Sequence, residues 1–574
     1  MSEIIVGIDL GTTNSEIAIV ENGKVTVIED SGRKILPSFV GISDSNKILV
    51  GEPAKNQYVL YPEKTVKSIK RKMGEEDKIE MAEKSYTPQE ISAIILKRLK
   101  TLAENYTNKS ISKAVITVPA YFSDSQRQAT REAGEIAGLE VVRMINEPTA
   151  AALSYKTENK KHILVYDLGG GTFDVSIVNI EDGVVEVIAS HGNNKLGGDD
   201  FDQKIADHIV EHIQEQFTVD IRESRKAMAR INRAAETAKR MLSDQPFIMI
   251  EEEYLYEYKG KSINLSLELA RNDYEEMIVD YIDETLEAVH VALNDADLTV
   301  SDIDEILLVG GSTRTPIVSK RLYQEFKQQP RIEIDPDLCV AAGAAIQAAI
   351  IAGQEISGSA VLVDITPYTY GTSAVGELDG EFYPCMYVPI IHKNSPLPLS
   401  KTELFFTMVD NQKIIEIKVY QGEDEDALKN IQVGEFIVEG LTEAPANSPI
   451  LLKLELDLNG ILSVSAIEKS TGLKKSITID NVISRFEVDE MQEAKERIQQ
   501  IFGETVEDIN EEEKTIKQAK VLIEKAEQLL DNAKDKEDMV DMIEAINDAI
   551  TADGSKILTE SMEQLSDIIY YLES

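Results

Sequence analysis

Two copies of one sequence pattern constrain the fold of this chain most strongly. In each copy an apolar strand ends in Asp-Leu-Gly, a short polar turn follows, and a second apolar strand returns. The first copy spans residues 4–20 and the second residues 164–178. Glycine has no Cβ and can take positive φ, so the N–H groups of Gly169, Gly170 and Gly171 can converge on an anion. We therefore expect two related hairpins that hold one phosphate chain between them, although each alone could be a glycine-rich turn inside a buried sheet.

Each hairpin carries an aspartate at the end of its first strand, Asp9 in the first copy and Asp167 in the second. A carboxylate beside a phosphate repels it unless a divalent cation lies between the two groups. We therefore expect Asp9 and Asp167 to hold a hydrated Mg²⁺ ion through water. Donors for the phosphates would come from the turns, namely from Gly11, Thr12, Thr13, Asn14, Gly169, Gly170, Gly171 and Thr172.

A third segment of the same kind spans residues 306–316. An apolar strand ends in Gly310-Gly311, and Ser312 and Arg314 follow. A guanidinium group can stack on a base because it is planar. One such loop is weak evidence, whereas three in this order indicate a nucleotide site.

Further motifs carry a family resemblance. They read Val-Pro-Ala-Tyr-Phe at 118–122, Asn-Glu-Pro-Thr-Ala-Ala-Ala at 146–152 and Leu-Gly-Gly-Asp-Asp-Phe-Asp at 196–202. Together with the three loops they resemble the 70-kDa heat-shock chaperones of the bacterial DnaK type. The resemblance runs from residue 4 to residue 485, and the residues beyond match only in being helical.

The resemblance implies a multidomain chaperone, an ATPase that couples hydrolysis to peptide binding. The implied parts are an actin-like, hexokinase-type α/β nucleotide-binding domain, an interdomain linker, an antiparallel β-sandwich substrate-binding domain and an α-helical lid, over residues 1–356, 357–364, 365–484 and 485–574. The residues themselves show an α/β pattern first, then apolar residues with period two, then helical spacing. The length of 574 residues is enough for three or four domains.

Spacing also predicts individual elements. Helices are expected at 92–102, 125–137, 228–242 and 341–352, and Asn459-Gly460 is expected to turn a β-hairpin. Residues 378–387 are expected to form a long aromatic loop between the first two strands of the β domain. Apolar stripes after Glu487 are expected to pack against each other as a small bundle, among them Val488, Met491, Ile498 and Ile501, and Ile516, Ile523 and Leu530.

Catalytic roles follow from the resemblance. Lys70 matches the family lysine that orients the attacking water, and Glu147 and Asp174 match carboxylates near the metal ion and that water. On its residues alone, Lys70 could equally be a surface lysine in a basic cluster. Phosphoryl transfer to water needs a bound metal ion, charge neutralisation and a positioned nucleophile. The implied cofactors are ATP or ADP and Mg²⁺, with K⁺ as a further candidate, and Asp9, Asp167 and Thr172 complete the catalytic set.

The helix expected at 228–242 carries Glu236, Lys239 and Arg240 on adjoining turns. They match family residues that hold adenosine, although without the resemblance they could form an ordinary charged helix face. The implied nucleotide-binding set also contains Ser243, Gly197, Gly198, Gly310, Gly311, Ser312, Arg314 and Asp337.

Other matched positions are implied to couple the domains. Pro119 and Arg127 match the switch pair that relays nucleotide state. Arg143, Asn146 and Asp364 match positions linked with J-domain co-chaperones. Val361 and Leu362 lie in the apolar linker, which in the family docks on the ATPase domain in one state and is exposed in the other. On its residues alone, this run could be an ordinary strand.

The β domain of the family binds extended apolar segments of unfolded clients. The matching pocket positions are Thr372, Val375, Phe405, Met408, Ile415, Ile417 and Ile461. Each alone is by default β-domain core, and only the set, beside a linker and a lid, indicates a peptide groove. The family's methionine–alanine arch appears here as Val375 opposite Met408, and the C-terminal region lacks the acidic tail of housekeeping members. A specialised regulatory chaperone with few clients is therefore the alternative.

Composition limits the partners. The chain has 59 basic and 102 acidic residues, a net charge of −43, which argues against nucleic acid and anionic membranes. Cys339 and Cys385 form no disulfide framework and no metal-binding spacing. The N-terminus does not resemble a signal peptide and the most apolar helix, 341–352, is too short to span a bilayer, so a bacterial cytoplasmic location is expected. The resemblance adds a J-domain co-chaperone and a GrpE-type exchange factor as partners.

Two other functions fit parts of the pattern. A metabolite kinase of the same ATPase fold would need a carboxylate base for a substrate hydroxyl, and it leaves the β domain and the lid unexplained. An actin-like filament protein disagrees with the net charge of −43 and with the two appended domains.

Overall fold

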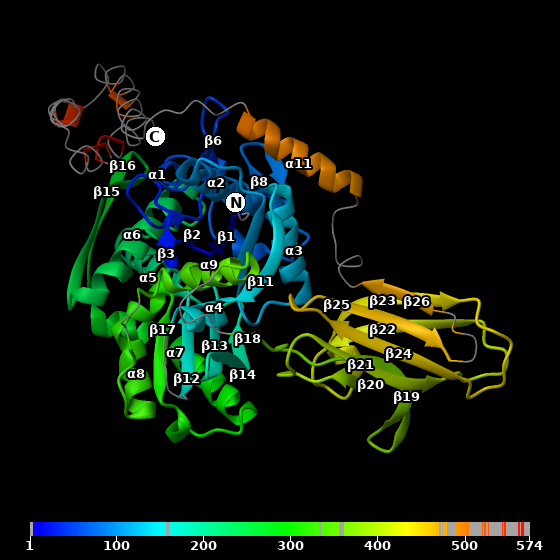
Figure 1. Cartoon of the computed structure of the whole chain (residues 1–574). Coiled ribbons are helices and arrows are strands. Elements are labelled where there is room, and N and C mark those ends of the chain that lie inside the picture. Colours follow the sequence, from blue (N-terminus) through cyan, green and yellow to red (C-terminus); the bar gives the residue numbers. More distant parts are fainter. Residues whose placement is uncertain are drawn as a thin grey trace.

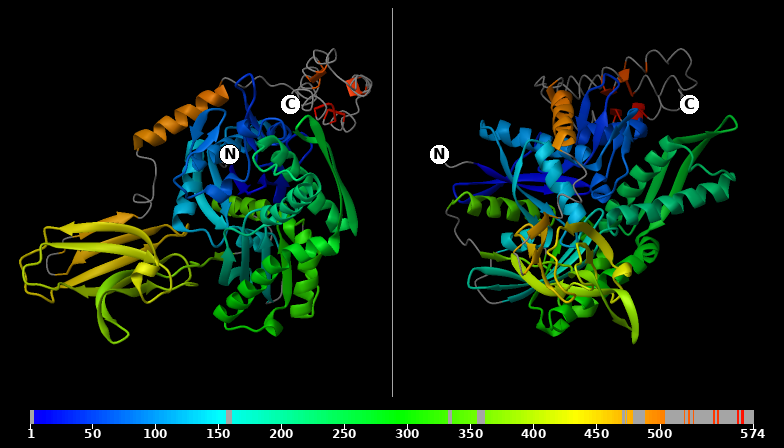
Figure 2. Two further views of the ribbon diagram at one scale, coloured as in Figure 1. Left: turned by 180° about the vertical axis from the view of Figure 1, so that it is seen from behind. Right: turned by 90° about the vertical axis from the view of Figure 1, so that its right-hand side faces the viewer.

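The computed structural model describes residues 4–155, 161–331, 335–354, 361–469, 472, 474–478 and 488–503, together with isolated positions between 519 and 566. A large α/β region, residues 4–354, lies beside a smaller β region, residues 364–478 (Figure 1). The strand β18 (Val361–Val363) lies between them in the chain. The helix α11 (Val488–Gly503) lies on the α/β region, away from the body of the β region (Figure 2).

The first half of the α/β region is built on a mixed sheet. Its central strand, β1 (Ile5–Leu10), is buried along its whole length. β1 pairs antiparallel with β2 (Asn14–Glu21) and parallel with β10 (Lys113–Val118). The first predicted hairpin is therefore confirmed. The sheet continues through β11 (Glu140–Asn146), β3 (Lys24–Val27) and β4 (Leu36–Pro37).

The second half of the α/β region repeats this plan. β12 (Lys161–Leu168) pairs antiparallel with β13 (Phe173–Glu181) and parallel with β17 (Glu305–Val309). β14 (Val184–Asn193) follows β13 in the sheet. In both sheets a hairpin therefore stands beside a parallel strand, and each hairpin carries its own Asp-Leu-Gly turn. The sequence repeat reflects a structural repeat.

One apolar helix lies against both halves. α9 (Cys339–Ile351) contributes buried residues to the cores on either side, and it packs against β1, β2 and α4 (Glu147–Ser154). The approach is close, because a Cβ on Gly343 would lie 1.7 Å from the Ala150 carbonyl oxygen. The predicted helix at 341–352 is confirmed with its ends shifted slightly, and its small residues allow the close packing.

Helix starts differ from the prediction where the first turn is polar. The expected helix at 92–102 lies within α2 (Pro88–Thr107). Thr87 and Glu90 form a reciprocal capping box at its start, as Ser123 and Gln126 do for α3 (Asp124–Ile136). These capping residues carry no apolar periodicity, so apolar spacing alone placed the start of α2 too late.

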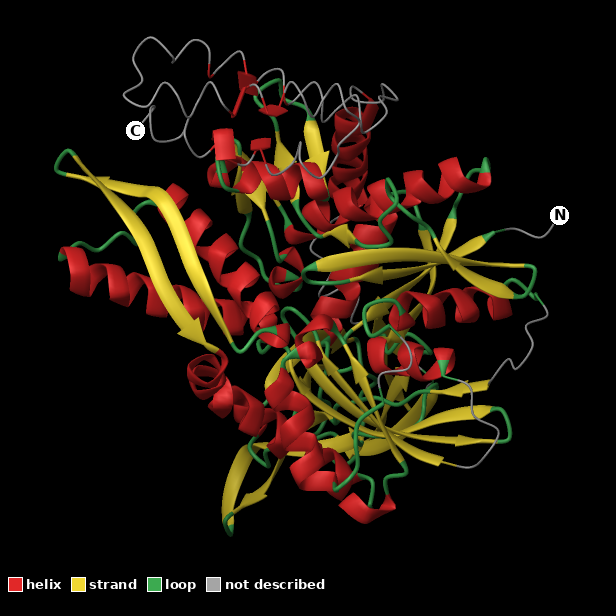
Figure 3. Ribbon diagram, turned by 90° about the vertical axis from the view of Figure 1, so that its left-hand side faces the viewer, coloured by secondary structure: helices red, strands yellow, loops and turns green. Residues whose placement is uncertain are grey.

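The remaining elements of the α/β region surround these cores, and the long β15–β16 hairpin stands at its edge (Figure 3). The helices are α1 (Glu52–Tyr58), α5 (Gly198–Phe217), α6 (Arg225–Asp244), α7 (Arg271–Asp295) and α8 (Pro316–Phe326), with short 3₁₀ helices η1 (Pro62–Lys64), η2 (Ile69–Lys72), η3 (Val300–Asp302) and η4 (Gly311–Arg314). The strands are β5 (Val40–Ile42), β6 (Ile48–Val50), β7 (Thr65–Val66), β8 (Ile79–Met81), β9 (Lys84–Tyr86), β15 (Phe247–Tyr258) and β16 (Lys261–Ala270).

The β region consists of two four-stranded antiparallel sheets that share one apolar core. The predicted period of two is confirmed in β24, where Ile450, Leu452, Leu454 and Leu456 are buried and the residues between them are less so. The predicted turn at Asn459-Gly460 joins β24 to β25. The strands are β19 (Tyr370–Leu378), β20 (Glu381–Ile391), β21 (Leu399–Phe406), β22 (Ile414–Gln421), β23 (Ile431–Glu439), β24 (Pro449–Leu456), β25 (Leu462–Glu468) and β26 (Lys474–Thr478), with η5 (Ala427–Lys429) between β22 and β23.

The predicted loop at 378–387 is wrong. β19 and β20 continue their pairing through this segment, with Glu377 opposite Phe382, and only Asp379-Gly380 turns the chain. Both turn residues have positive φ, 54° and 81°. An Asp-Gly pair favours such a tight turn, and aromatic residues favour strands. The aromatic residues therefore extend a hairpin.

The described part of the linker adds a strand to the α/β region. β18 pairs in parallel with β14, with Val361 opposite Val184 and Leu362 opposite Val185. Residues 355–360 lie outside the described residues. The apolar run is thus a strand in this structure, and it is docked on the second sheet.

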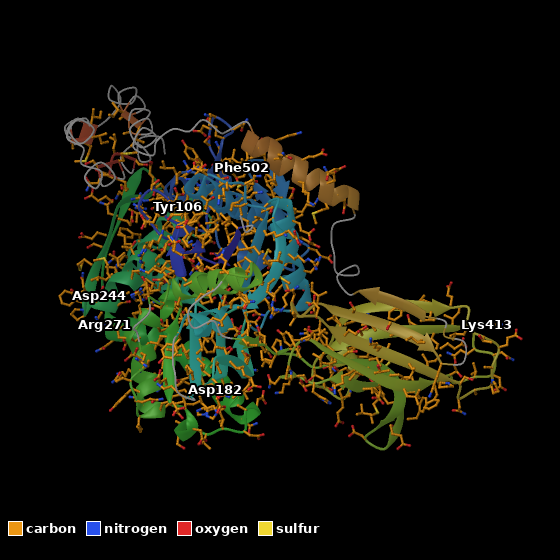
Figure 4. The ribbon with its side chains drawn as sticks, viewed as in Figure 1. Tyr106, Asp182, Asp244, Arg271, Lys413 and Phe502 are labelled. Carbon is orange, nitrogen blue, oxygen red and sulfur yellow. The ribbon has the colours of Figure 1, made fainter. Side chains whose placement is uncertain are left out.

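The expected packing of α11 within a helical bundle is wrong. Ala494 and Ile498 are buried in the core formed by β1 and α2, and Met491, Ile501 and Phe502 pack around them. Figure 4 labels Phe502, on the α/β region. An ion pair of 2.7 Å joins Arg497 to Glu90 at the start of α2. The apolar stripe therefore binds the α/β region. The side chain of Val488 and residues Ile516 and Leu530 lie outside the described residues, whereas Ala519, Ile523, Ala526, Ile546 and Leu565 are buried.

Among the described helices, none combines the length and the apolar character that crossing a membrane requires.

Candidate functional site

The two aspartates of the repeated pattern are buried in one polar site. Asp9 ends its strand with Oδ1 accepting a 2.7 Å hydrogen bond from the Thr117 hydroxyl. Burial raises the pKa of Asp9, against the attraction of Lys70. Burial raises the pKa of Asp167 well above its ordinary value, and the charges of Glu147, Asp174 and Asp9 add to the shift. Four carboxylates therefore lie close to one another.

One ammonium group faces these carboxylates. Lys70, on η2, is only 3% exposed and forms an ion pair with Glu147. Burial alone would lower the pKa of Lys70, but Glu147 and Asp9 outweigh it and raise the pKa. The interpretation of Lys70 as a surface lysine is therefore wrong. Since one ammonium cannot balance four carboxylates, the site fits a further cation, as a hydrated divalent ion would supply.

Two more carboxylates complete the group. Glu147 begins α4, and burial raises its pKa to about 7 even though Lys70 opposes the shift. Asp174 lies on β13 and accepts a 2.9 Å hydrogen bond from the Tyr121 N–H. Burial raises the pKa of Asp174 to about 6, against this hydrogen bond. Burial thus raises the pKa of both carboxyl groups, and strongly shifted pKa values are common at functional sites.

The three glycines allow the two hairpins to meet. A Cβ on Gly170 would lie 1.9 Å from Thr13 Oγ1, and a Cβ on Gly171 would lie 2.7 Å from Thr12 Cγ2. None of the three is among the glycines with positive φ. Close approach of the two hairpins, rather than positive φ, is therefore the reason for glycine here. The turn donors of both hairpins can thus face one ligand.

A second pair of glycines rests on this turn. Gly198 N–H donates to the Gly169 carbonyl at 2.9 Å, and Asp199 N–H donates to the Gly170 carbonyl at 2.7 Å. A Cβ on Gly197 would lie 2.6 Å from the Gly170 backbone. The start of α5 is therefore held directly on the triple-glycine turn. This cradle has no room for side chains, and it fits the phosphates of a nucleotide.

The third loop reaches the same place. Ser312 donates its hydroxyl hydrogen to the Gly169 carbonyl at 2.8 Å. Lys239, on α6, donates to the Gly198 carbonyl at 2.9 Å and pairs with Asp202 at 2.8 Å. Gly310 has a φ of 80°, and its Cβ position lies 2.5 Å from the Leu168 carbonyl oxygen. Residues from three separate loops therefore converge on the triple-glycine turn.

The remaining predicted base-binding residues lie around α6 and η4. Arg314 pairs with Asp337 at 2.8 Å, and a Cβ on Gly311 would lie 3.2 Å from that carboxylate. Arg240 is largely exposed and lies 3.8 Å from Glu236. Ser243 lies at the end of α6, where Arg271 donates to the Leu242 carbonyl at 2.7 Å and lies near Asp244 (Figure 4).

Several contacts beside the site are not indicated by any sequence motif. Lys55, on α1 of the first half, pairs with Glu236 of the second half at 3.0 Å. Arg71 likewise reaches Asp200 at 3.1 Å. Lys55 and Arg71 therefore each form an ion pair between the two halves of the α/β region, next to the site. Only the fold brings these partners together, so neither spacing nor local pattern could have found them.

The predicted coupling residues form a hydrogen-bonded series. Arg127 donates to Asn146 Oδ1 at 2.7 Å, and Asn146 donates to Asp364 Oδ1 at 2.9 Å. Arg143 is buried near Asp364. Pro119 accepts from the Phe122 N–H at 3.2 Å, within the loop that precedes α3. The series joins the α/β region to the residue that follows β18.

The predicted pocket residues do not share one environment. Phe405, Ile415 and Ile417 belong to the core of the β region. Thr372 is buried and donates to the Lys418 carbonyl at 2.7 Å. Ile461 instead packs against the α/β region. Its neighbours there are Val118, Phe122 and Met144.

Two predicted pocket residues are exposed, Met408 at 64% and Val375 at 42%. Further exposed apolar side chains lie in the same part of the chain as Met408, at the end of β21 and the start of β22, and the sequence analysis missed them. They are Leu404, Phe406, Val409 and Ile414.

Comparison with known proteins adds a family match. The model of the family described as "Hsp70 protein" matches residues 5–573. The "Chaperone protein DnaK" of Thermotoga neapolitana is 48% identical over 492 residues, covering 83% of this chain and 80% of the relative. The protein of the same name from Thermosipho africanus is 48% identical over 485 residues, with the same two shares.

Proposed function

The chain belongs to the Hsp70 family and is an ATP-dependent molecular chaperone and an ATPase, and from this premise we propose how its parts divide the work. Residues 1–356 act as an actin-like nucleotide-binding domain, 357–364 as the linker, 365–484 as a β-sandwich that binds peptide, and 485–574 as a helical lid. ATP binding and hydrolysis switch the β region between fast and slow exchange of extended apolar segments of unfolded clients.

The buried polar site is proposed to hydrolyse ATP. Bound Mg²⁺ would supply charge neutralisation for the phosphates, and K⁺ is a further candidate ion. Asp9 and Asp167 would hold the hydrated ion, and the Gly11–Asn14 and Gly169–Thr172 turns would donate to phosphate oxygens. Lys70 would orient the attacking water, since Glu147 holds its ammonium group in place. Asp174 would accept a hydrogen bond from that water.

The adenosine would lie on the other side of the glycine cradle. Glu236, Lys239, Arg240 and Ser243 of α6 would hold it together with Gly310, Gly311, Ser312, Arg314 and Asp337. The proposal is supported by Lys239 and Ser312, which both contact the cradle. A guanidinium such as that of Arg314 can stack on a base.

The observation that carries the proposed switch is the pairing of β18 with β14. An apolar linker strand added to the sheet of the ATPase region is a discrete element with a docked and an undocked state. The Arg127–Asn146–Asp364 series would relay nucleotide state to it. Pro119 and Arg143 would complete this relay.

Clients would bind at the exposed apolar surface around Met408 and Val375, supported by the buried Ile417 and by the partly buried Phe405 and Ile415. Exposed apolar side chains grouped on one part of a soluble domain are typical of binding sites. Thr372 and Ile461 complete the proposed set. A J-domain co-chaperone and a GrpE-type exchange factor are the proposed partners, in the bacterial cytoplasm.

The proposal is tested by ATP turnover in buffer alone, with an unfolded peptide, and with simple sugars. Stimulation by the peptide and not by sugars is the expected result. Stimulation by sugars would indicate a metabolite kinase, and nucleotide-dependent polymers would indicate a filament protein. Capture of clients by the chain with its ATPase arrested would distinguish a general chaperone from a specialised one with few clients.

A further inference from the structure

One sheet of the β region carries apolar side chains across three neighbouring strands, β21, β24 and β25 (Figure 1). Leu404 on β21 lies directly opposite Leu451 on β24, and Leu451 lies directly opposite Ile467 on β25. Residues opposite each other in an antiparallel pair share a face, so these three side chains form one row. In the adjoining row Phe406 lies opposite Pro449. We call these five residues the outer stripe.

The outer stripe lies on the face of the sheet that is turned away from the core. Side chains alternate between the two faces of a strand, and the residues next to the stripe on β24 and β25, Ile450, Leu452 and Ala466, belong to the apolar core. Leu404 and Phe406 are 40% and 54% exposed, and the other three stripe residues are partly exposed. An antiparallel sheet usually presents polar side chains to water on this face, so a continuous apolar stripe is typical of a contact surface.

The row beside the stripe is polar and is satisfied within the protein. Thr402 lies opposite Lys453, and Lys453 lies opposite Ser465. Lys453 forms an ion pair with Glu455 at 2.6 Å, so its charge is balanced by its own neighbour. An apolar segment can therefore cover the stripe without leaving Lys453 unpaired.

The outer stripe adjoins the proposed client surface. Thr407 joins Phe406 of the stripe to Met408, and its N–H donates to the Ser448 carbonyl at 3.0 Å, next to Pro449. The chain thus passes from the stripe to Met408 while still held beside β24. A second copy of this chain is a poor occupant, because two bodies that each carry a net charge of −43 repel each other. An apolar segment of a client that already lies at Met408 has no such barrier.

We propose that the outer stripe is a second client-binding surface, which takes a further apolar run of the same polypeptide that is bound around Met408. The proposal rests on the proposed function, and it names the client class that gains most: unfolded chains with two apolar runs joined by a flexible segment. Binding of the second run is then intramolecular, so affinity rises without any change in the first contact.

The test compares three labelled peptides on the full-length chain. The first has one apolar run, the second has two such runs joined by a flexible Gly-Ser linker, and the third has the second run replaced by serine. Wild type should bind the two-run peptide about tenfold more tightly than the other two. Leu451→Thr keeps a residue that favours strands but removes apolar surface, so this advantage should fall to about twofold, the statistical gain of two runs for one surface. Its affinity for the one-run peptide should not change.

Ile437→Thr is the matched control, because Ile437 is 49% exposed on β23 of the other sheet, and it should keep the full advantage. Should Leu451→Thr fail to fold, Ile467→Thr carries the same expectation. A twofold advantage in wild type, or an undiminished one in Leu451→Thr, would overturn the outer stripe as a client surface, as would a wild-type dimer in sedimentation that Leu451→Thr abolishes. If wild type does not bind even the one-run peptide, the proposed function fails as well, so the two failures are distinguishable.

Discussion

The polar site around Asp167 and the apolar surface around Met408 differ in their exposure to solvent. Lys70 is 3% exposed and pairs with Glu147, so these buried charged groups have partners within the protein. The side chains of Met408 and Phe406 are instead 64% and 54% exposed to solvent. Buried charges need partners within the protein, whereas exposed apolar groups gain free energy only when something covers them. This difference supports the proposal that the first site is preorganised and that the second accepts different segments.

The two sites also differ in how they are built. The proposed nucleotide site draws on elements far apart in the sequence, including β1, η2, α4 and β13. Most of the exposed apolar side chains come from one continuous segment around β21 and β22, and Val375 comes from β19. A substitution in the first site should therefore change rate steeply, whereas one in the second should change affinity modestly.

Lys70→Ala should give the largest effect. Removing the ammonium group that we propose orients the attacking water should lower single-turnover hydrolysis about 10²- to 10⁴-fold, as expected for a positioning group. ATP binding should persist, because it is spread over the glycine cradle and Lys239. The matched control is Lys72→Ala, since Lys72 is half-exposed and pairs with the nearby Glu75 at 2.9 Å. Hydrolysis within about threefold of the wild type would remove Lys70 from the mechanism.

Truncation after Phe502 should have a smaller effect. It retains α11, which packs on the α/β region, and removes the later helices. A lid lowers the off-rate of a bound segment without adding side-chain pockets, so peptide release should accelerate about tenfold, roughly 1.4 kcal/mol. Because the proposed lid is short even in the full chain, the full chain should also exchange peptide fast in ADP. On a peptide array the rank order should be preserved, and a reshuffled order would place recognition in the helices.

Met408→Ala should weaken peptide binding about fivefold, the range expected for losing part of a covered methionine side chain. Thermal stability should not change, because the side chain is mostly exposed in the free protein. Ile431→Ala serves as the matched control, since Ile431 is equally exposed on β23. Fluorescence titration with a labelled apolar peptide measures both. Equal affinity of Met408→Ala and the wild type would remove Met408 from the client surface.

Titration of Asp124 should give the smallest effect, a change in the strength of docking with pH. Burial in the docked state raises its pKa to about 6, while Tyr370 and Arg127 oppose the shift and Asp457 adds to it. The docked state therefore binds a proton more tightly than an undocked state in which Asp124 is hydrated. Docking should strengthen about two- to threefold as pH falls from 7.5 to 5.8, and the gain is lost as pH rises through 6.

Energy transfer between dyes on the two regions measures this docking in the presence of ATP. Asp124→Asn keeps a hydrogen-bond acceptor for Tyr370 but cannot titrate, so this part of the pH response should vanish. An unchanged response in the variant would assign the pH dependence to other carboxylates.

The sequence predicted the local parts of the fold well. Asp9 and Asp167 each follow an apolar strand, and the repeated pattern was enough to expect both hairpins and their meeting. Lys70 was assigned by the family motif, because a basic cluster gives no sign that one lysine is buried. Contacts between distant segments were missed, such as Lys55 with Glu236 and Tyr368 with Tyr121. Tertiary packing alone decides these.

Two errors have a common physical cause. Residues 378–387 were expected to loop, and the α11 stripe was expected to face other helices. In each case the local sequence is compatible with both the expected and the observed structure, and the partner that is available in the fold determines which one forms. β19 offers a pairing edge to β20, and α2 offers an apolar face to Ile498.

Control of peptide exchange by nucleotide is tested most directly by stopped-flow release of a labelled peptide from the wild type and from Leu362→Asp. Leu362 lies on β18 and packs against the core beneath it, so a charge there should oppose docking at a cost of about 2 kcal/mol or more. Leu428→Asp is the control, because Leu428 is exposed on η5. ATP should accelerate release from the wild type and from the control, and should have no effect on release from Leu362→Asp while still binding. Equal acceleration in Leu362→Asp would contradict the role of β18 as the coupling element.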